Sequence, residues 1–263
     1  MPSILITRYP CSLMNKIESN PVIDLLRAHR SIRRFEDRVV DDEIVREVVA
    51  CGQAAATSSN VQAVSIIQVK SPEKRQRLAE LAGGQAYVAS AGAFLVYCAD
   101  LHRPAAACAS QGGEFEPGMT EHFMIATIDV GLSAQTAVIA AESMGLGICY
   151  IGGLRNNPAE VAELLGLPEQ VYPVFGLCLG YPAQDPEVKP RIAVDAVLMQ
   201  EVYDADAQSA HVAAYDEALS EYYQSRTGGN KDSNWSREMK ALVGKESRPH
   251  MRGFLADRGF TMR

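Results

Sequence analysis

A cationic cluster with the sequence HRSIRR occupies residues 29–34. Arginine guanidinium groups bind phosphate through paired hydrogen bonds, and a serine hydroxyl supplies one more donor. The cluster follows a short helix that we predict to begin at Asn20 and Pro21, because asparagine caps helix N-termini and proline suits the first helical position. These residue types indicate an anion-binding turn, and a solvated basic turn is the alternative.

A second cationic cluster is Lys189-Pro190-Arg191. Proline restricts the backbone, so the two cations project from a rigid turn. The whole chain carries a formal net charge of −7. Two basic clusters in an acidic chain favour a shared anionic ligand in a local pocket, although each alone is compatible with surface charge. The same net charge argues against a nucleic-acid partner.

Two further segments are candidates to line a ligand beside these cations. In YIGGLRNN, residues 150–157, a predicted strand runs into two glycines, which let the backbone approach a ligand and expose N–H donors. In the segment from Thr57 to Gln62, small hydroxyl and amide side chains suit a polar slot. A tight turn and a helix-terminal loop are the respective alternatives.

Several catalytic and metal-binding patterns are absent from the sequence. It contains no G-x-S-x-G, H-E-x-x-H or Walker motif. The six cysteines form no C-x-x-C pair, and the five histidines lack metal-ligand spacing. We therefore predict no metal site. We interpret the cysteines as free thiols in a reducing compartment, which together with the absence of a signal-peptide pattern predicts a cytoplasmic protein.

Short apolar strands and amphipathic helices must position these residues. The length of 263 residues allows one or two domains. We predict strands at 64–69, 93–98, 148–151 and 171–179, helices at 72–81 and 158–165, a helix starting at 41–42, and a loop at 102–117. The helix at 119–144 is so apolar that we expect it to be buried nearly all round. Its Asp129, Gln135 and Glu142 argue against a membrane span. One α+β or α/β domain, with its sheet covered on both faces, follows.

The sequence changes character after Pro190. Residues 195–205 are expected to be extended, and an amphipathic helix at 210–225 precedes a polar glycine loop at 227–234 and a last helical region from Trp235 to Val243. This part is too polar to form a core alone, so we expect it to pack on the main body or on a second subunit. Residues 1–19 are interpreted as an N-terminal extension.

Eight motifs in one order identify a family. They are HRSIRRF, ATSSNVQ, GGQAYV, YIGGLRNN, VFGLCLGYP, VKPR, YDEALSEYY and KESRP, and they run from about residue 20 to the C-terminus. The set resembles the oxygen-insensitive NADPH nitroreductases and the NADPH–flavin oxidoreductases, which are FMN-dependent. The resemblance implies an α+β fold with a central mixed sheet covered by helices and an extended C-terminal arm from about residue 195. It also implies a homodimer with two noncovalent FMN sites at the subunit interface.

The resemblance also implies roles for individual residues. His29, Arg30, Ser31, Lys189 and Arg191 are expected to hold the FMN phosphate and ribityl chain. Arg33, Ser58, Ser59, Gln62, Gln85, Tyr150, Ile151, Gly152, Gly153 and Leu154 are expected to line the flavin ring. Arg226 and Lys231 match a cationic loop that binds NADPH, and Arg248 matches a further active-site cation. Of all these, Arg33, Ser59 and Arg248 are expected to act at the catalytic centre. Three features differ from the family pattern: Asn60 replaces an aromatic residue, Lys231 replaces an arginine, and segment 102–117 is longer.

The implied activity is a ping-pong cycle in which NADPH reduces FMN, leaves, and is replaced by a nitroaromatic or quinone acceptor. A fixed Arg33 would stabilise negative charge at the N1–C2 edge of the ring. Two alternatives remain open: a dedicated NADPH–flavin reductase, and a non-enzymatic flavin-binding protein, which would not need Arg226 and Lys231.

Overall fold

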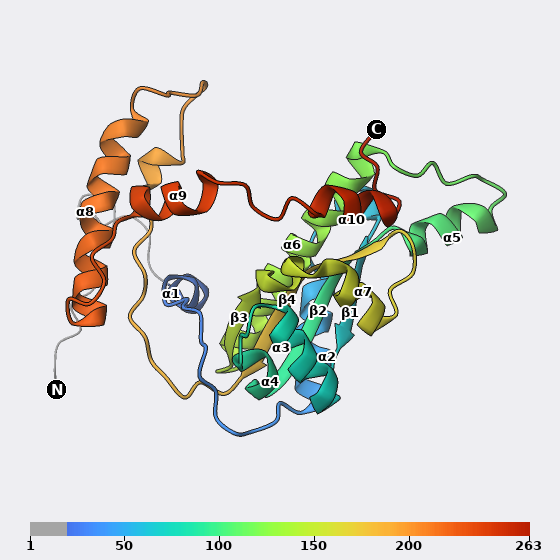
Figure 1. The fold of residues 1–263 in the computed structure, drawn as a ribbon, viewed down its shortest axis with the longest axis horizontal. Coiled ribbons are helices and arrows are strands. Elements are labelled where there is room, and N and C mark those ends of the chain that lie inside the picture. Colours follow the sequence, from blue (N-terminus) through green and yellow to red (C-terminus); the bar gives the residue numbers. More distant parts are fainter. Residues whose placement is uncertain (1–19) are drawn as a thin grey trace.

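The computed structural model describes residues 20–263, so the predicted N-terminal extension at 1–19 lies outside the described residues. A four-stranded sheet in the order β1-β2-β4-β3 forms its centre (Figure 1). The strands are β1 (Val64–Gln68), β2 (Ala93–Asp100), β3 (Gly147–Ile151) and β4 (Val171–Gly180). Neighbouring strands all pair antiparallel. Within residues 20–263 the only parallel pairing is an isolated bridge between Ser31 and Ile148, so the predicted mixed sheet is mixed only in that sense.

Helices cover both faces of this sheet. The α-helices are α1 (Pro21–Arg27), α2 (Asp42–Gln53), α3 (Pro72–Leu81), α4 (Tyr87–Ser90), α5 (His102–Ser110), α6 (Thr120–Ser143), α7 (Pro158–Leu165), α8 (Gln208–Thr227), α9 (Trp235–Val243) and α10 (Met251–Asp257). Short 3-10 turns are η1 (Ser58–Asn60), η2 (Gly152–Asn156) and η3 (Val194–Ala196).

Strand β2 shows how the sequence builds two apolar layers, because successive side chains of a strand point to opposite faces. Every residue of β2 is buried. Leu95 and Tyr97 lie in the layer that includes α2 and α6, whereas Phe94 and Val96 lie in the layer that includes α3, α4 and α7. The prediction of an α+β domain with helices on both faces of the sheet is therefore confirmed.

Helix α6 is long and apolar enough to cross a membrane by length and composition alone. One side of it packs on α2 and the sheet and buries Ala126, Val130 and Ala134, as a core helix does. The opposite side carries an exposed stripe of Met124, Ile128 and Leu132, which are 48%, 54% and 44% exposed. The prediction that α6 is buried nearly all round is thus wrong for the single chain, because no element of the described chain covers this stripe.

Several segments differ from the sequence-based prediction: helix α4 was not predicted, and the 3-10 turn η3 occupies the start of segment 195–205, which was expected to be extended. The predicted loop at 102–117 begins with helix α5, because Pro104 is tolerated in its first turn and the alanines that follow are good helix formers despite the nearby glycines. The chain also ends with α10, which was not predicted. Phe254 and Leu255 of α10 are buried in the main core, and this tertiary contact, rather than a long periodic pattern, stabilises so short a helix.

The C-terminal arm stands beside the sheet domain rather than on it. Helices α8 and α9 lie apart from the strands (Figure 1) and form their own cluster around Leu219, Tyr222 and Tyr223. The chain then returns to the main body, where α10 packs. The segment before α8 exposes several apolar side chains: Val194, Val197, Leu198, Val202 and Tyr203.

Candidate functional site

The HRSIRR turn lies between α1 and strand β3. Ser31 bridges Ile148, and the Ile32 amide donates to the Ile148 carbonyl at 2.8 Å, so the turn is fixed to the edge of the sheet. His29 reaches the C-terminal part of α6, where its Nδ1 is 2.7 Å from Oε1 of Glu142. These contacts place the predicted anion-binding residues beside the strand that leads into the two glycines.

Backbone pairing brings the segment before the second cationic cluster alongside the first. Phe35 forms an antiparallel bridge with Pro182, and the Ala183 amide donates to the Arg34 carbonyl at 2.9 Å. A side-chain contact follows, because Arg30 forms an ion pair with Asp185 through Nη2. These contacts join residues 182–185, which precede the second cluster, to the first cluster.

The Lys189-Pro190-Arg191 turn is anchored on helix α8. Nζ of Lys189 lies 3.2 Å from the Tyr223 hydroxyl, and the Tyr215 hydroxyl donates to the Pro190 carbonyl at 2.9 Å. Arg191 is exposed, and within residues 20–263 it donates only to the carbonyls of Lys189, at 2.8 Å, and Pro190. Because carbonyls do not neutralise a guanidinium, Arg191 retains its charge for an external anion.

Arg30 has a polar atom that the described residues leave unsatisfied. Its Nε is buried and has no hydrogen-bond partner. Buried polar groups in folded proteins nearly always have partners, and a bound anion would supply one for this donor. The Asp185 carboxylate that pairs with Arg30 is 83% exposed, so water screens it and little free energy is needed to displace it.

Gln85 and Arg33, which were predicted for one edge of the flavin, are linked through Tyr87; we call these three residues the wall. The Tyr87 hydroxyl donates to Oε1 of Gln85, whose Nε2 donates to the Ala82 carbonyl at 2.7 Å. Burial, chiefly, raises the pKa of Tyr87, whereas a hydrogen bond with Arg33 acts in the opposite direction. A Cβ built at Gly153 would lie less than 3.0 Å from Gln85 Nε2, so η2 packs directly against this wall.

Tyr150 and the start of η2 face α6. The Tyr150 hydroxyl donates to Oε1 of Gln135 at 3.3 Å, and burial raises the pKa of Tyr150 to about 12. Tyr150, Gly152 and Gln135 line a cavity of about 320 Å³ together with Gly131, Arg155 and Phe175. Ile151 and Leu154 are buried in the core beneath, so they support this backbone rather than line an open surface.

The hydroxyl loop, which we define as residues 58–63, belongs to a different part of the chain. The Ser58 amide is bonded to Asp129 of α6, and the Gln62 carbonyl to Arg103 at the start of α5. Across residues 20–263, no hydrogen bond or ion pair links Ser58, Ser59 or Gln62 to Arg33 or Gln85. Within one chain, these contacts therefore do not join the residues of the hydroxyl loop to Arg33 and Gln85.

The arm cations are held against tyrosine rings. Arg226 Nη1 lies 3.1 Å from the Tyr222 hydroxyl, and Lys231 Nζ lies 3.9 Å from the centre of the Tyr223 ring. Lys231 also pairs with Glu238 at 3.0 Å. Lys189 shares Tyr223 with Lys231, so one ring connects the predicted phosphate-binding turn to the predicted NADPH-binding loop.

Arg248 reaches the two-glycine turn from the segment that joins α9 to α10. Its Nε donates to Oδ1 of Asn156 at 3.0 Å, and His250 Nε2 lies 2.9 Å from the Arg155 carbonyl. The pKa of Arg155 is lowered first by burial and then by the nearby charge of Arg248. Two guanidinium groups thus lie close together at this end of the site, where an acidic or negatively polarised ligand would be stabilised.

Sequence reasoning missed Asp185, Glu142, Arg155 and Tyr87 as site residues. Tyr87 lies within the motif GGQAYV and Arg155 within the motif YIGGLRNN, so these two had a local signal, whereas Asp185 and Glu142 had none. The cysteine interpretation is consistent with the structure, since the five described cysteines are free thiols. Burial raises the pKa of Cys98 to about 12, which disfavours a nucleophilic thiolate there.

Comparisons with known proteins agree with this geometry. The sequence model described as "Nitroreductase family" matches residues 26–181, and that described as "Nitroreductase family, C-terminal domain" matches residues 189–263. The chain is 44% identical over 244 residues to NADPH-flavin oxidoreductase of Vibrio harveyi, covering 93% of this chain and 100% of that protein. It is 39% identical over 244 residues to oxygen-insensitive NADPH nitroreductase of Salmonella typhimurium, with the same coverage. The solved structure of NADPH:FMN oxidoreductase from Vibrio harveyi complexed with NAD+ matches with a TM-score of 0.85 and 42% identity, over 93% of this chain and 100% of that one. The chain belongs to the nitroreductase family.

Proposed function

We propose that the protein is an FMN-dependent NADPH oxidoreductase that reduces nitroaromatics or quinones by a ping-pong cycle. The observation that carries this proposal is the pair of cationic clusters: within residues 20–263, Arg30 has a buried Nε without a partner and Arg191 donates to backbone carbonyls alone. Family membership and the names of the relatives support the same conclusion.

The residues present fit FMN at both ends. Arg30, Lys189 and Arg191 supply cationic donors for a phosphate, and His29 and Ser31 lie in the same turn as Arg30. Arg33, Gln85 and the Gly152–Gly153 backbone supply donors for the polar edge of a flavin ring. Bound FMN supplies the hydride-carrying chemistry, whereas the protein binds and orients it and sets the local charge.

A direct experiment tests the proposal. The purified protein should be yellow, and anaerobic NADPH should bleach the visible absorption of the flavin within one turnover. A colourless protein that gains no flavin absorption when incubated with FMN would contradict it. Turnover of free FMN against a quinone at equal concentration would distinguish a dedicated flavin reductase from the proposed enzyme. A yellow protein that NADPH does not bleach would instead be a flavin-binding protein.

The phosphate assignment makes a specific prediction. Arg30→Ala and Arg191→Ala should each weaken FMN binding by tenfold or more, because loss of a hydrogen bond to a charged group costs about 1.5–3 kcal/mol. Fluorescence titration of the apoprotein with FMN measures this. Arg38→Ala is a control, since that guanidinium stacks over the Tyr181 ring at 3.7 Å instead of belonging to either cationic cluster. Unchanged flavin content of both variants after extensive dialysis would refute the assigned phosphate site.

We propose that Arg226 and Lys231 recognise the 2′-phosphate of NADPH. Gly228 and Gly229, between the two cations, both have left-handed φ angles of 60° and 85°, which glycine adopts without strain. Arg226 is exposed, and its Nη1 is bonded to the Tyr222 hydroxyl. Lys231 is already paired with Glu238. Arg226 is therefore expected to contribute more to phosphate binding than Lys231.

Arg226→Ala should lower kcat/KM for NADPH by about tenfold or more and leave NADH turnover nearly unchanged, because the 2′-phosphate is the difference between the two donors. Lys231→Ala should have the same effect more weakly, since lysine binds phosphate without a bidentate fork. Higher salt should reproduce both effects, because an exposed contact is screened. Steady-state kinetics with both nicotinamides measures these effects. Equal losses of kcat/KM with NADPH and NADH would contradict the assignment of Arg226 and Lys231 to the 2′-phosphate.

We also propose a cytoplasmic homodimer with no membrane or nucleic-acid partner. The exposed stripe of α6 supports a second copy, since it places Met124, Ile128 and Leu132 on one face of a helix whose other side forms the core. In such a dimer the hydroxyl loop, which is hydrogen-bonded to Asp129 of α6, would contribute Ser58 and Ser59 to a flavin site at the interface. The hydroxyl loop of one subunit would then lie beside Arg33 and Gln85 of the other subunit.

A further inference from the structure

The hydroxyl loop has a backbone conformation that its sequence does not favour. Ser59, Asn60 and Gln62 have φ angles of 46°, 58° and 53°. The left-handed region is adopted readily by glycine and rarely by other residues, and such strain persists only where surrounding structure imposes it. Ser58, Ser59 and Asn60 are all exposed, so burial of their side chains does not impose it. The restraint must come from contacts to the loop backbone.

One restraint is a buried carboxylate in the middle of helix α6. Asp129 is only 1% exposed, and its oxygens each accept a backbone N–H: Oδ1 from Ser58 at 3.1 Å and Oδ2 from Ala63 at 3.2 Å. The two donors are the first and last residues of the hydroxyl loop, so one side chain fixes both of its ends. Burying a carboxylate in an apolar helix is unfavourable unless it is hydrogen-bonded, and here the loop supplies both bonds.

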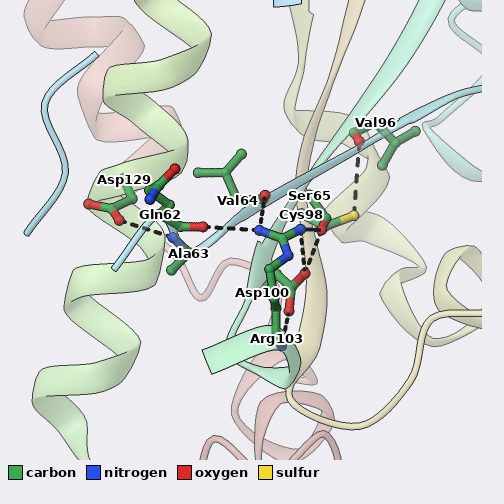
Figure 2. Close-up of polar contacts among 9 residues, drawn as sticks. All are labelled: Gln62, Ala63, Val64, Ser65, Val96, Cys98, Asp100, Arg103 and Asp129. Atoms are coloured by element: carbon green, nitrogen blue, oxygen red, sulfur yellow. Dashed lines mark hydrogen bonds and ion pairs between the residues drawn. The ribbon is translucent and has the colours of Figure 1, made fainter. Parts of the chain in front are cut away.

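A second restraint acts from the opposite side (Figure 2). Nη1 of Arg103, at the start of α5, donates to the carbonyls of Gln62 at 3.2 Å and Val64 at 3.3 Å. Its Nη2 contacts Ser65 Oγ at 2.7 Å and Asp100 Oδ2 at 3.3 Å. Asp100 is buried and also accepts a hydrogen bond from Ser65, so the guanidinium is fixed by partners other than the loop.

We propose that Asp129 and Arg103 are positioning residues that clamp the hydroxyl loop in the shape needed for FMN binding. Asp129 binds the N–H groups of the loop, and Arg103 binds the Gln62 carbonyl, so the two side chains restrain complementary groups of one short segment. The inference rests on the proposed function, because it takes Ser58, Ser59 and Gln62 as flavin-binding residues. Neither clamp residue contacts the reacting atoms, and both act through the loop.

The test is Asp129→Asn in the full-length protein. An asparagine side chain has nearly the same shape but only one oxygen, so one of the two loop N–H groups loses its acceptor and faces an NH₂ group instead. Fluorescence titration of the apoprotein should show FMN affinity reduced by about tenfold. Hydrogen–deuterium exchange of the amides at 58–63 should be faster than in the wild type.

Val130→Ala is the matched control. Val130 is the next residue of α6 and is fully buried in the core, so this variant lowers Tm without removing a contact to the loop. Its FMN affinity should remain within about twofold of the wild type, and exchange in the loop should be unchanged, because cavity formation acts on global stability. A fall in FMN affinity in Val130→Ala equal to that in Asp129→Asn would reduce Asp129 to a stability role and overturn the proposal.

Two further outcomes separate the hypotheses. A wild type that binds FMN, together with unchanged affinity and exchange in Asp129→Asn, overturns the clamp but leaves the proposed function intact. A wild type that binds no FMN overturns the proposed function and the loop's role toward flavin with it. If Asp129→Asn does not fold, Arg103→Met replaces it, since the Arg103 side chain is 58% exposed, and about threefold weaker FMN binding is then expected.

Discussion

Ile128→Glu should convert the protein from a dimer into monomers at micromolar concentration. Ile128 is the central residue of the exposed α6 stripe, one helical turn from both Met124 and Leu132. In a symmetric dimer the substitution would bury a carboxylate in each half of the interface, and an unpaired buried charge costs several kcal/mol. A total of about 3 kcal/mol already raises the dissociation constant roughly a hundredfold. Sedimentation velocity measures the species present.

The monomeric variant should also lose FMN, because the proposed sites lie at the subunit interface. Val39→Glu is the control: Val39 is 75% exposed, and it lies in the chain before α2 rather than on α6. That variant should remain dimeric and yellow. A wild type that sediments as a 28.5 kDa monomer with FMN bound would contradict the dimer, and a dimeric Ile128→Glu would place the interface elsewhere on the molecule.

The main elements were predictable because their local patterns agree with their tertiary environment. Strand β4 is a continuous apolar run and is buried on both faces, and α3 is marked by Ser71 and Pro72 at its N-terminus. Helix α10 was not predicted, since Phe254 and Leu255 reveal their role only when they meet the distant core. The exposed stripe of α6 was not predicted either. Composition alone does not distinguish a helix that is buried within its own chain from a helix that a second subunit covers.

The candidate site was predictable as a set of motifs but not as an arrangement. The HRSIRR and YIGGLRNN segments are recognisable by residue type, and the bridge of Ser31 to Ile148 joins them. The partners that fix them come from far along the chain, as Glu142 does for His29 and Asn156 for Arg248. Such pairs depend on strand register and on the path of the C-terminal arm, and neither leaves a local signal in the sequence.

Gly153 illustrates the same limit, since the sequence alone assigned its small size to close approach of a ligand. In the structure, a Cβ at this position would lie less than 3.0 Å from Gln85 Nε2 and from the Ala82 carbonyl oxygen. Gln85 is a flexible side chain, but the Ala82 carbonyl is backbone at the end of α3 and has little freedom to move. The glycine is therefore required first by packing between η2 and α3, and the backbone that we propose to face the flavin depends on that packing.

Gly153→Ala should weaken FMN binding by roughly a hundredfold, because overpacking costs about 1–3 kcal/mol and here also displaces Gln85 from the ring edge. Gly152→Ala is the matched control. A Cβ there would meet the Arg155 guanidinium, with Nη2 at 3.1 Å and no backbone atom among its three nearest neighbours, so a change of less than about threefold is expected. Fluorescence titration with FMN and the Tm of each apoprotein are the measurements. Equal affinities in the two variants would mean that contact between η2 and Gln85 does not shape the flavin site, and that the two glycines serve the turn alone.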